Sequence, residues 1–250
     1  MQDGKTVTTG LVLRVTETKE ADKILTVLTP DRGKIPLIAR GARRKNSRIA
    51  AASQLLAYSE LTLYRRGSWF LLDEASTVEL FDGVRRDIVL LALASYFAEL
   101  TEAVCPEETA APELLSLLLN ALYALCYLDR EARLVKAAFQ LRLLALAGFE
   151  PLASSCAVCG RPEPEAPMLD VVHGVVHCGG CKRQGGLSMP LTAAGLAALR
   201  HILYCDSKKL YSFTLEEMAL RELDHAGEAF AASQLERSFR TLDYYKALLG

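Results

Sequence analysis

The chain lacks the features of a membrane or secreted protein. The apolar stretch without a charged residue at positions 114–128 is too short to cross a bilayer as a helix. Residues 1–10 are polar and lack the basic region followed by an apolar region that marks an export signal, so none is expected. The seven cysteines are then more consistent with reduced thiols or metal ligands than with disulfides. We expect a soluble, cytoplasmic protein with no membrane partner.

Acidic residues are missing from one long segment. Between Asp31 and Glu60 none occurs, although the net charge of the whole chain is only −1. Cations are instead concentrated in this segment: Arg32, Lys34, Arg40, Arg43, Arg44, Lys45 and Arg48. Cations without counter-charges repel one another, so a polyanion such as nucleic acid is the expected partner. A solvated surface with no ligand is the alternative interpretation.

The amino-terminal third of the chain has the pattern of strands. Five β-rich runs are separated by turn residues: Val7–Thr16, Lys23–Thr29, Lys34–Ala39, Leu55–Tyr64 and Trp69–Val78. Pro30–Gly33 and Arg66–Ser68 are the clearest hairpin turns, because proline presets one torsion and glycine accepts a positive φ. Five short strands predict a small barrel, and the long basic connection after the third strand is typical of a functional loop.

Four aromatic residues lie in or beside the last two predicted strands: Tyr58, Tyr64, Trp69 and Phe70. Exposed rings on a small barrel can stack on the bases of a single strand. A ring in a strand more often packs in the core, and this is what we expect for Trp69 and Phe70.

From about Arg85 the pattern changes to long apolar segments of helical type. A helical pattern resumes at Thr192 after a segment rich in Pro, Gly and Cys, and Thr214 with Glu217 has the spacing of a capping box for the following helix. We predict an α+β chain with a barrel domain in residues 1–82 and an all-helical domain in residues 83–250. The cysteine-rich module is inserted at about 150–188.

Two C-x2-C pairs give the sharpest motif in the sequence. Cys156 and Cys159 form the first pair, Cys178 and Cys181 form the second, and the segment 160–177 separates them. This spacing is typical of a tetrahedral zinc site with four sulfur ligands. Four protein ligands leave no open position for water, so we predict one structural Zn²⁺. Two redox dithiols or four unpaired thiols are the alternatives, and His173 or His177 is near enough in sequence to replace a cysteine.

Signatures of catalysis are missing as well. The chain has no G-x4-G-K-[ST] loop, since Gly41–Ser47 lacks the second glycine. A zinc deaminase would carry an H-x-E motif before its cysteines, and this sequence has none. It would also keep a catalytic water on the metal, for which four thiolates leave no position. A redox C-x-x-C should open a helix after a strand, whereas Cys156 and Cys159 lie in a Pro- and Gly-rich loop. We therefore predict that the protein is not an enzyme and takes no small-molecule substrate.

The amino-terminal block resembles that of the bacterial RecO recombination mediators. The resemblance is carried by Thr16–Thr29, by Gly33–Ile35 and by Ala39–Arg44, and it extends over the whole chain. It implies an oligonucleotide-binding (OB) barrel, a helical domain and an inserted four-cysteine zinc module. It also implies DNA repair activity: binding of single- and double-stranded DNA and annealing of complementary strands without ATP. Together with RecR, such a protein helps to load recombinase onto strands coated by single-stranded DNA-binding protein.

The resemblance also assigns residues and partners. Lys34, Arg40, Arg43 and Arg44 match the basic positions of the family's barrel, and Lys45 and Arg48 extend that run; the four paired cysteines match its zinc ligands. Expected partners are DNA, RecR and the C-terminal tail of the single-stranded DNA-binding protein, with association with the nucleoid when bound to DNA. The helical segments carry no motif that assigns a site for the tail. The alternative function is a zinc-ribbon scaffold that binds only proteins.

Overall fold

The computed structural model describes residues 4–67, 69–181 and 185–250 and resolves two compact units. The first unit consists of the chain up to Cys126 together with Arg240–Gly250, and the second of Tyr127–Phe239. Ser68 of the second predicted hairpin and residues 182–184 of the predicted insertion lie outside the described residues. The predicted domain division after residue 82 stays a prediction.

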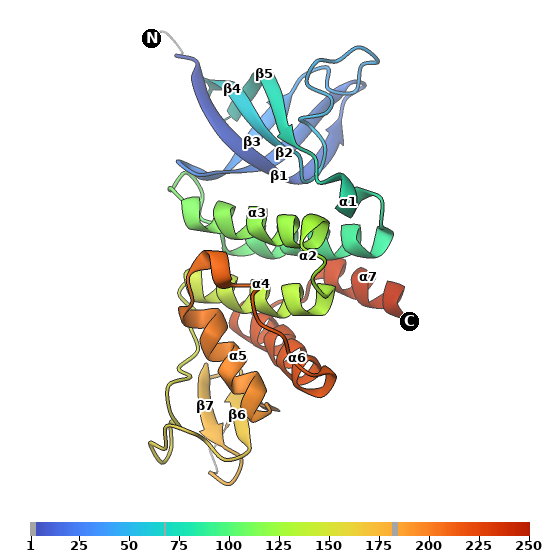
Figure 1. The fold of residues 1–250 in the computed structure, drawn as a ribbon. Coiled ribbons are helices and arrows are strands. Elements are labelled where there is room, and N and C mark those ends of the chain that lie inside the picture. The colour runs from blue at the N-terminus through green and yellow to red at the C-terminus, as the bar shows by residue number, and fades with distance from the viewer. Residues whose placement is uncertain (1–3, 68, 182–184) are drawn as a thin grey trace. The chain divides into compact units, whose positions relative to one another are not determined.

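A closed five-stranded barrel forms the amino-terminal part of the first unit (Figure 1). Its strands are β1 (Thr6–Thr18), β2 (Asp22–Thr29), β3 (Gly33–Ala39), β4 (Tyr58–Arg66) and β5 (Trp69–Glu79). The strand order is β1-β2-β3-β5-β4, and β4 pairs with β1 to close the barrel. Only β3 and β5 are parallel neighbours; the other pairs of these described strands are antiparallel. The predicted small barrel of OB type is confirmed.

Alternating apolar residues fill the barrel, as the period of two along each strand requires. Leu25 and Val27 of β2, Ile35 and Leu37 of β3, and Phe70 of β5 all point inward and are buried in one cluster. The residues between them therefore lie on the outer face. This division of faces decides where each functional side chain of the barrel can act.

Two turns hold the strands in register. Gly33, at the end of the predicted β2–β3 hairpin, has φ +59°, and a Cβ at this position would collide with the carbonyl oxygens of Pro106 and Thr109. Only glycine fits there. At the end of the connection from β3 to β4, the strand β4 begins at Tyr58 and not at Leu55 as predicted. Leu56 has φ +61°, which is not a strand conformation, although its N–H donates to Val12 O.

The described part of the first unit also contains four helices: α1 (Asp82–Arg85), α2 (Ile88–Val104), α3 (Pro112–Tyr127, its last residue in the second unit) and α7 (Arg240–Leu249). Asp87 caps α2 by accepting hydrogen bonds from the N–H groups of Val89 and Leu90. The carboxyl-terminal α7 packs on α2, and Thr241 donates both its N–H and its hydroxyl to Glu99. The end of the chain thus joins the unit that contains its beginning.

The second unit is helical with a small sheet. Its helices are α4 (Ala132–Leu146), α5 (Ala193–Tyr204) and α6 (Glu217–Gln234), with a short 3₁₀ turn at Ser207–Lys209. Strands β6 (Pro167–Asp170), β7 (Val175–Cys178) and β8 (Ser188–Pro190) form an antiparallel sheet in the order β7-β6-β8. In the part of the chain that the structure describes, every helix is too short or too polar to pass through a membrane.

The predicted helix starts have different outcomes. Thr192 caps α5 by accepting a hydrogen bond from the N–H of Gly195, where the helical pattern was expected to resume. The capping box at Thr214 and Glu217 is wrong: α6 begins at Glu217, and its N-cap residue is Glu216 with no side-chain cap. Positions 212–216 belong to no helix or strand, so Thr214 lies before the first turn and does not accept its N–H groups.

A buried ionic cluster joins α4 to α6. Lys136 contacts Asp224 at 3.0 Å between Nζ and Oδ2 and also contacts Glu228, and all three side chains are nearly closed to solvent. One cation thus faces two carboxylates. Burial raises the pKa of Asp224 to about 6, although Lys136 partly opposes the shift. Asp224 Oδ1 is buried with no hydrogen-bond partner among the described residues, which adds to the cost of the charged form.

This cluster predicts a specific pH dependence of stability. A carboxyl whose pKa is raised on folding stabilises the folded state below its unfolded value of 3.8, and this contribution is lost as the pH rises through about 6. Asp224→Asn has no carboxyl to titrate at this position, so its stability should not show this pH dependence. Between pH 4 and 7 we expect the free energy of unfolding of the wild type to fall, relative to that of the variant, by up to about 3 kcal/mol. Urea unfolding at several pH values measures it. Glu216→Gln, an exposed position at the start of α6, is the control and should show no such trend.

Candidate nucleic-acid interface and metal centre

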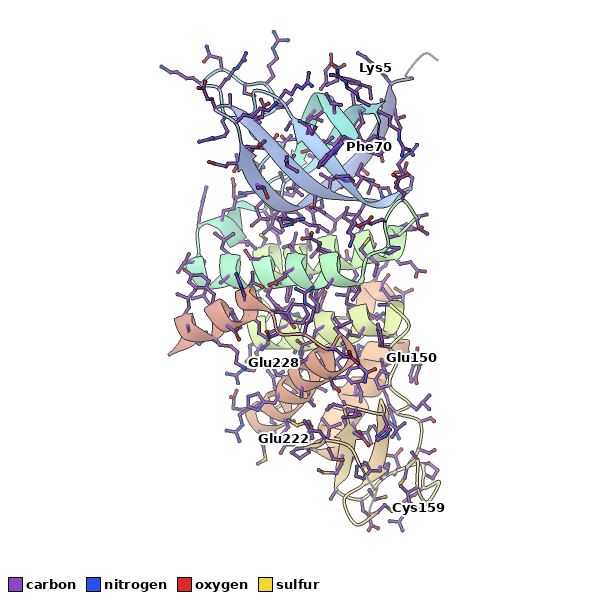
Figure 2. All side chains as sticks on the ribbon, turned by 180° about the vertical axis from the view of Figure 1, so that it is seen from behind. Lys5, Phe70, Glu150, Cys159, Glu222 and Glu228 are labelled. Atoms are coloured by element: carbon purple, nitrogen blue, oxygen red, sulfur yellow. The ribbon has the colours of Figure 1, made fainter. Side chains whose placement is uncertain are left out.

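The four cysteines of the two C-x2-C pairs meet in the second unit. Cys156 and Cys159 lie in the connection between α4 and β6, Cys178 is the last residue of β7, and Cys181 follows it. Their four sulfur atoms all lie within 4.8 Å of one another. Figure 2 shows Cys159 at the tip of the module, at the end away from the helices of this unit.

The arrangement of these sulfur atoms fits one metal ion. At a zinc–sulfur distance of about 2.3 Å, a tetrahedral site places its sulfur atoms about 3.8 Å apart. The distance between the sulfur atoms of Cys159 and Cys178 is 3.9 Å. The four sulfur atoms are thus close enough together to surround one ion, and a set of four thiolates leaves no position for water.

The backbone around Cys156 is arranged for a thiolate. Its sulfur accepts the N–H groups of Val158, Cys159 and Cys178 at 3.4–3.5 Å. Burial raises the pKa of the Cys156 thiol. The backbone hydrogen bonds and a further hydrogen bond from the Cys159 thiol outweigh this effect and lower the pKa to about 6. Such N–H···S contacts favour the charged form that binds metal.

The cysteine loops are held by local contacts. Leu152 N–H donates to Gly174 O, just before β7, and Ala157 N–H donates to Val176 O within β7. Arg200 of α5 donates to the carbonyl oxygens of Ala153, Ser154 and Pro162 and pairs with Glu163. The guanidinium thus binds the loop that carries the first knuckle to the helix behind it.

The two histidines near the cysteines have other partners. His177 is buried, with Nδ1 at 2.8 Å from Cys178 O and Nε2 at 2.8 Å from Ser188 Oγ. His173 contacts the buried carboxylate of Asp170, 2.7 Å from its Nδ1. Among the described residues the metal-binding group consists of cysteines alone, so neither histidine replaces one.

The basic segment forms a tightly folded connection between β3 and β4. A series of turns runs from Arg40 to Ala57, and Gly41 N–H donates to Asp22 Oδ1 at 2.8 Å. Ala42 and Ile49 are buried in the barrel core. The connection is therefore fixed at two points to the barrel. Figure 2 shows its side chains projecting away from the strands.

Four cations of this connection, which we call the basic loop, are exposed and form no ion pair within the described residues: Arg40, Arg44, Lys45 and Arg48. Arg40, Arg44 and Arg48 line a depression of about 350 Å³ with Asp73 on β5. Because the loop is anchored, these cations are held together, and the carboxylate of Asp73 in the same depression is paired with Lys5 at 2.6 Å. Such a surface can bind a phosphate backbone.

The other predicted cations have partners. Arg43 pairs with Glu17 at 3.0 Å. Lys34 lies at the beginning of β3, about 20 Å of strand away from Arg40, and donates to Glu102 O at the end of α2. Arg32 packs over the ring of Phe70. The structure thus brings together four of the predicted DNA-binding residues, holds Arg43 beside them in an ion pair and places Lys34 elsewhere.

The aromatic residues divide between the two faces of the barrel. Phe70 is 3% exposed and belongs to the core, as expected. Trp69 is 37% exposed, so the expectation that its ring packs in the core is wrong. Consecutive strand residues point to opposite faces, so only one of the two rings can be inside. Tyr58 and Tyr64 are half-buried.

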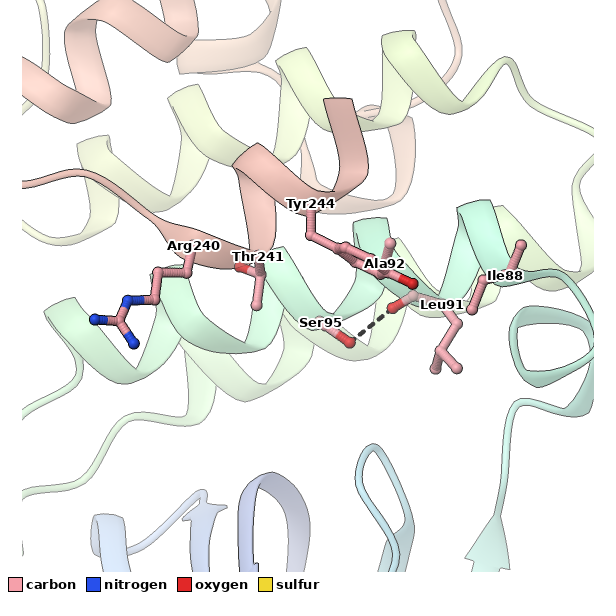
Figure 3. Close-up of a pocket in the computed structure, with 7 residues that line it drawn as sticks. All are labelled: Ile88, Leu91, Ala92, Ser95, Arg240, Thr241 and Tyr244. Atoms are coloured by element: carbon pink, nitrogen blue, oxygen red, sulfur yellow. Dashed lines mark hydrogen bonds between the residues drawn. The ribbon is translucent and has the colours of Figure 1, made fainter. Parts of the chain in front are cut away.

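One cavity was not signalled by any motif. A groove of about 290 Å³ lies between α2 and α7, at the lower end of the volumes usual for ligand pockets. Figure 3 shows the residues that line it: Ile88, Leu91, Ala92, Ser95, Arg240, Thr241 and Tyr244. Its surface is mainly apolar, and its two sides, 88–95 and 240–244, are far apart in sequence. Only the packing of α7 on α2 creates it.

Two family models match the chain. "Recombination protein O N terminal" matches residues 1–81, and "Recombination protein O C terminal" matches residues 85–243. Curated relatives named "DNA repair protein RecO" match over nearly their full length. The protein of Acetivibrio thermocellus is 31% identical over 96% of both chains, that of Symbiobacterium thermophilum 32% over 96%, and that of Anaeromyxobacter dehalogenans 36% over 97%.

Proposed function

Because the chain belongs to the recombination protein O family, we propose that it is a recombination mediator of DNA repair that binds single- and double-stranded DNA and anneals complementary strands without ATP. With RecR it helps to load recombinase onto strands coated by single-stranded DNA-binding protein. It contacts the C-terminal tail of that coating protein. It acts in the cytoplasm and joins the nucleoid when bound to DNA.

The observation that carries this proposal is the basic loop. Arg40, Arg44, Lys45 and Arg48 are exposed on an anchored connection, where they can neutralise phosphates without first breaking ion pairs. Binding then releases counterions from the DNA. Two strands that share this surface repel each other less, and base pairing supplies the free energy of annealing. No step requires hydrolysis of a nucleotide, so we propose that the protein is not an enzyme.

We assign the four-cysteine site to a single Zn²⁺ with a structural role. Cys156, Cys159, Cys178 and Cys181 would hold it, and when bound it would cross-link the two knuckles of the module. The thiolates of these residues saturate a tetrahedral ion. The module therefore contributes to folding of the second unit and not to a chemical step.

The proposal is tested by annealing two complementary labelled oligonucleotides, each coated with the host's single-stranded DNA-binding protein, without ATP. We expect the full chain to accelerate annealing at least tenfold, since screening of strand repulsion and access to coated strands are both needed. A parallel reaction with bare oligonucleotides separates annealing from the contact with the coating protein. Addition of RecR and recombinase then tests loading.

Each result has a distinct meaning. Acceleration with bare strands alone would refute the partnership with the coating protein and keep the DNA activity. A folded, metal-loaded sample that accelerates neither reaction would contradict the mediator function. A zinc-ribbon scaffold that binds only proteins would then be the better description.

A further inference from the structure

A row of apolar side chains crosses the outer face of the barrel. Ile38 of β3 is paired with Leu71 of β5, and Leu71 is paired in turn with Tyr64 of β4. Their neighbours Leu37, Phe70 and Leu63 point into the core, so these three side chains point outward. Leu71 is nevertheless only 2% exposed, which shows that the outer face is closely packed around it.

Trp69 stands next to this row. It is the only tryptophan in the sequence and is 37% exposed. Its partner across the β4–β5 pair is Arg66, which is exposed and has no ion pair within the described residues. Tyr64 is diagonal to Trp69 across the same two strands, about 7–8 Å away. Two aromatic side chains and a guanidinium therefore share one face near the tip of the β4–β5 hairpin.

This surface is continuous with the basic loop. On β3, Ile38 is followed by Ala39, which ends the strand in the core, and then by Arg40, the first residue of the basic loop. On β5, Asp73 is the second residue after Leu71. Both Arg40 and Asp73 line the basic depression. From Trp69 to Asp73 the strand covers about 14 Å. Aromatic and cationic groups thus follow one another along a path on the outer face of β3, β4 and β5.

We propose that Trp69 and Tyr64 form a base-stacking platform for single-stranded DNA, with Arg66 beside it and the phosphate backbone running toward Arg40 and Arg44. This platform rests on the proposed function, and it is the part of the DNA-binding surface that is specific for single strands. Unpaired bases present their faces to aromatic side chains, whereas the bases of a duplex are already stacked on one another. The basic loop then serves both forms of DNA, and the platform discriminates between them.

The single tryptophan provides the test, because its fluorescence reports on Trp69 alone. The full chain is titrated with an oligo(dT), with an abasic oligonucleotide of equal length and with a duplex, and binding is followed in parallel by anisotropy of labelled DNA. We expect oligo(dT) to quench the fluorescence while the abasic strand and the duplex bind without quenching. Trp69→Ala should weaken oligo(dT) binding about tenfold, leave abasic binding and the salt slope unchanged, and be largely rescued by Trp69→Phe.

Tyr244→Ala is the control, since Tyr244 is an exposed aromatic of α7 outside this path. Equal quenching by oligo(dT) and the abasic strand, or normal oligo(dT) affinity in Trp69→Ala, would overturn the platform while the protein still binds DNA. Loss of all binding in the anisotropy measurement with the wild type would instead refute the proposed function. The two failures are therefore distinguishable.

Discussion

Replacing Cys156 by serine should remove the bound metal and destabilise the second unit by at least about 3 kcal/mol. Structural zinc contributes roughly 10–16 kcal/mol of binding free energy in small zinc domains, which is comparable to the whole stability of a domain. Cys156 is 1% exposed, and its sulfur accepts three backbone N–H groups. A neutral serine hydroxyl would not replace a thiolate as a zinc ligand and does not carry the charge that these N–H groups stabilise.

Two measurements check this prediction. Metal analysis of wild-type protein purified under reducing conditions should give one zinc per chain, and the variant should give well below one. Thermal unfolding should show the second unit melting about 10 °C lower or more in the variant. Cys205→Ser is the matched control, because Cys205 is half-buried and lies outside the cysteine cluster.

The first unit should remain functional in the Cys156→Ser variant. Its basic loop belongs to the barrel, whereas the cysteines belong to the second unit. Below the melting temperature of the variant we expect its affinity for single-stranded DNA to stay within about twofold of the wild type, since the phosphate contacts are retained. A Cys156→Ser protein as stable as Cys205→Ser, or a wild type without metal, would contradict the structural role.

The parts of the fold that local patterns encode were predictable. Both knuckles are short, so the spacing of their cysteines was enough to predict the metal-binding group. Alternating apolar residues located all five strands; the largest misplacement is the start of β4, at Leu55 instead of Tyr58, and the other bounds differ by at most two residues. There the cause is the left-handed conformation of Leu56, which a β-branched or aliphatic pattern does not signal.

Other features depend on contacts between distant residues. Lys34 and Arg40 are close in sequence, but the extended strand β3 separates them, because Lys34 is its second residue and Arg40 follows its last. The pairing of Arg43 with Glu17 and the packing of α7 on α2 also needed the tertiary structure. Trp69 is a different case: the period of two along β5 excludes a core position for it once Phe70 is inside, so its exposure could have been inferred from sequence.

Removing the four exposed cations of the basic loop should weaken binding of single-stranded DNA about a hundredfold at physiological salt. Each phosphate contact contributes about 0.7 to the slope of log affinity against log salt concentration. At about 0.15 M salt, one contact therefore raises the affinity by roughly 0.6 logarithmic units relative to 1 M salt. For Arg40, Arg44, Lys45 and Arg48 together, the expected loss is therefore about two orders of magnitude. The slope itself should become shallower by about 3. Anisotropy titrations of one labelled oligonucleotide at several salt concentrations measure both quantities.

The decisive comparison keeps the change in net charge constant. A variant in which Arg130, Lys208, Lys209 and Arg221 are replaced by alanine loses the same four charges from exposed positions of the second unit. If DNA binds at the basic loop, this control keeps nearly all of its affinity and its salt slope, because the cations that contact phosphates are unchanged. Equal losses in the two variants would mean that net charge, and not the anchored loop, controls binding. Arg43→Ala should lie between them, since Arg43 must first leave Glu17 before it can contact a phosphate.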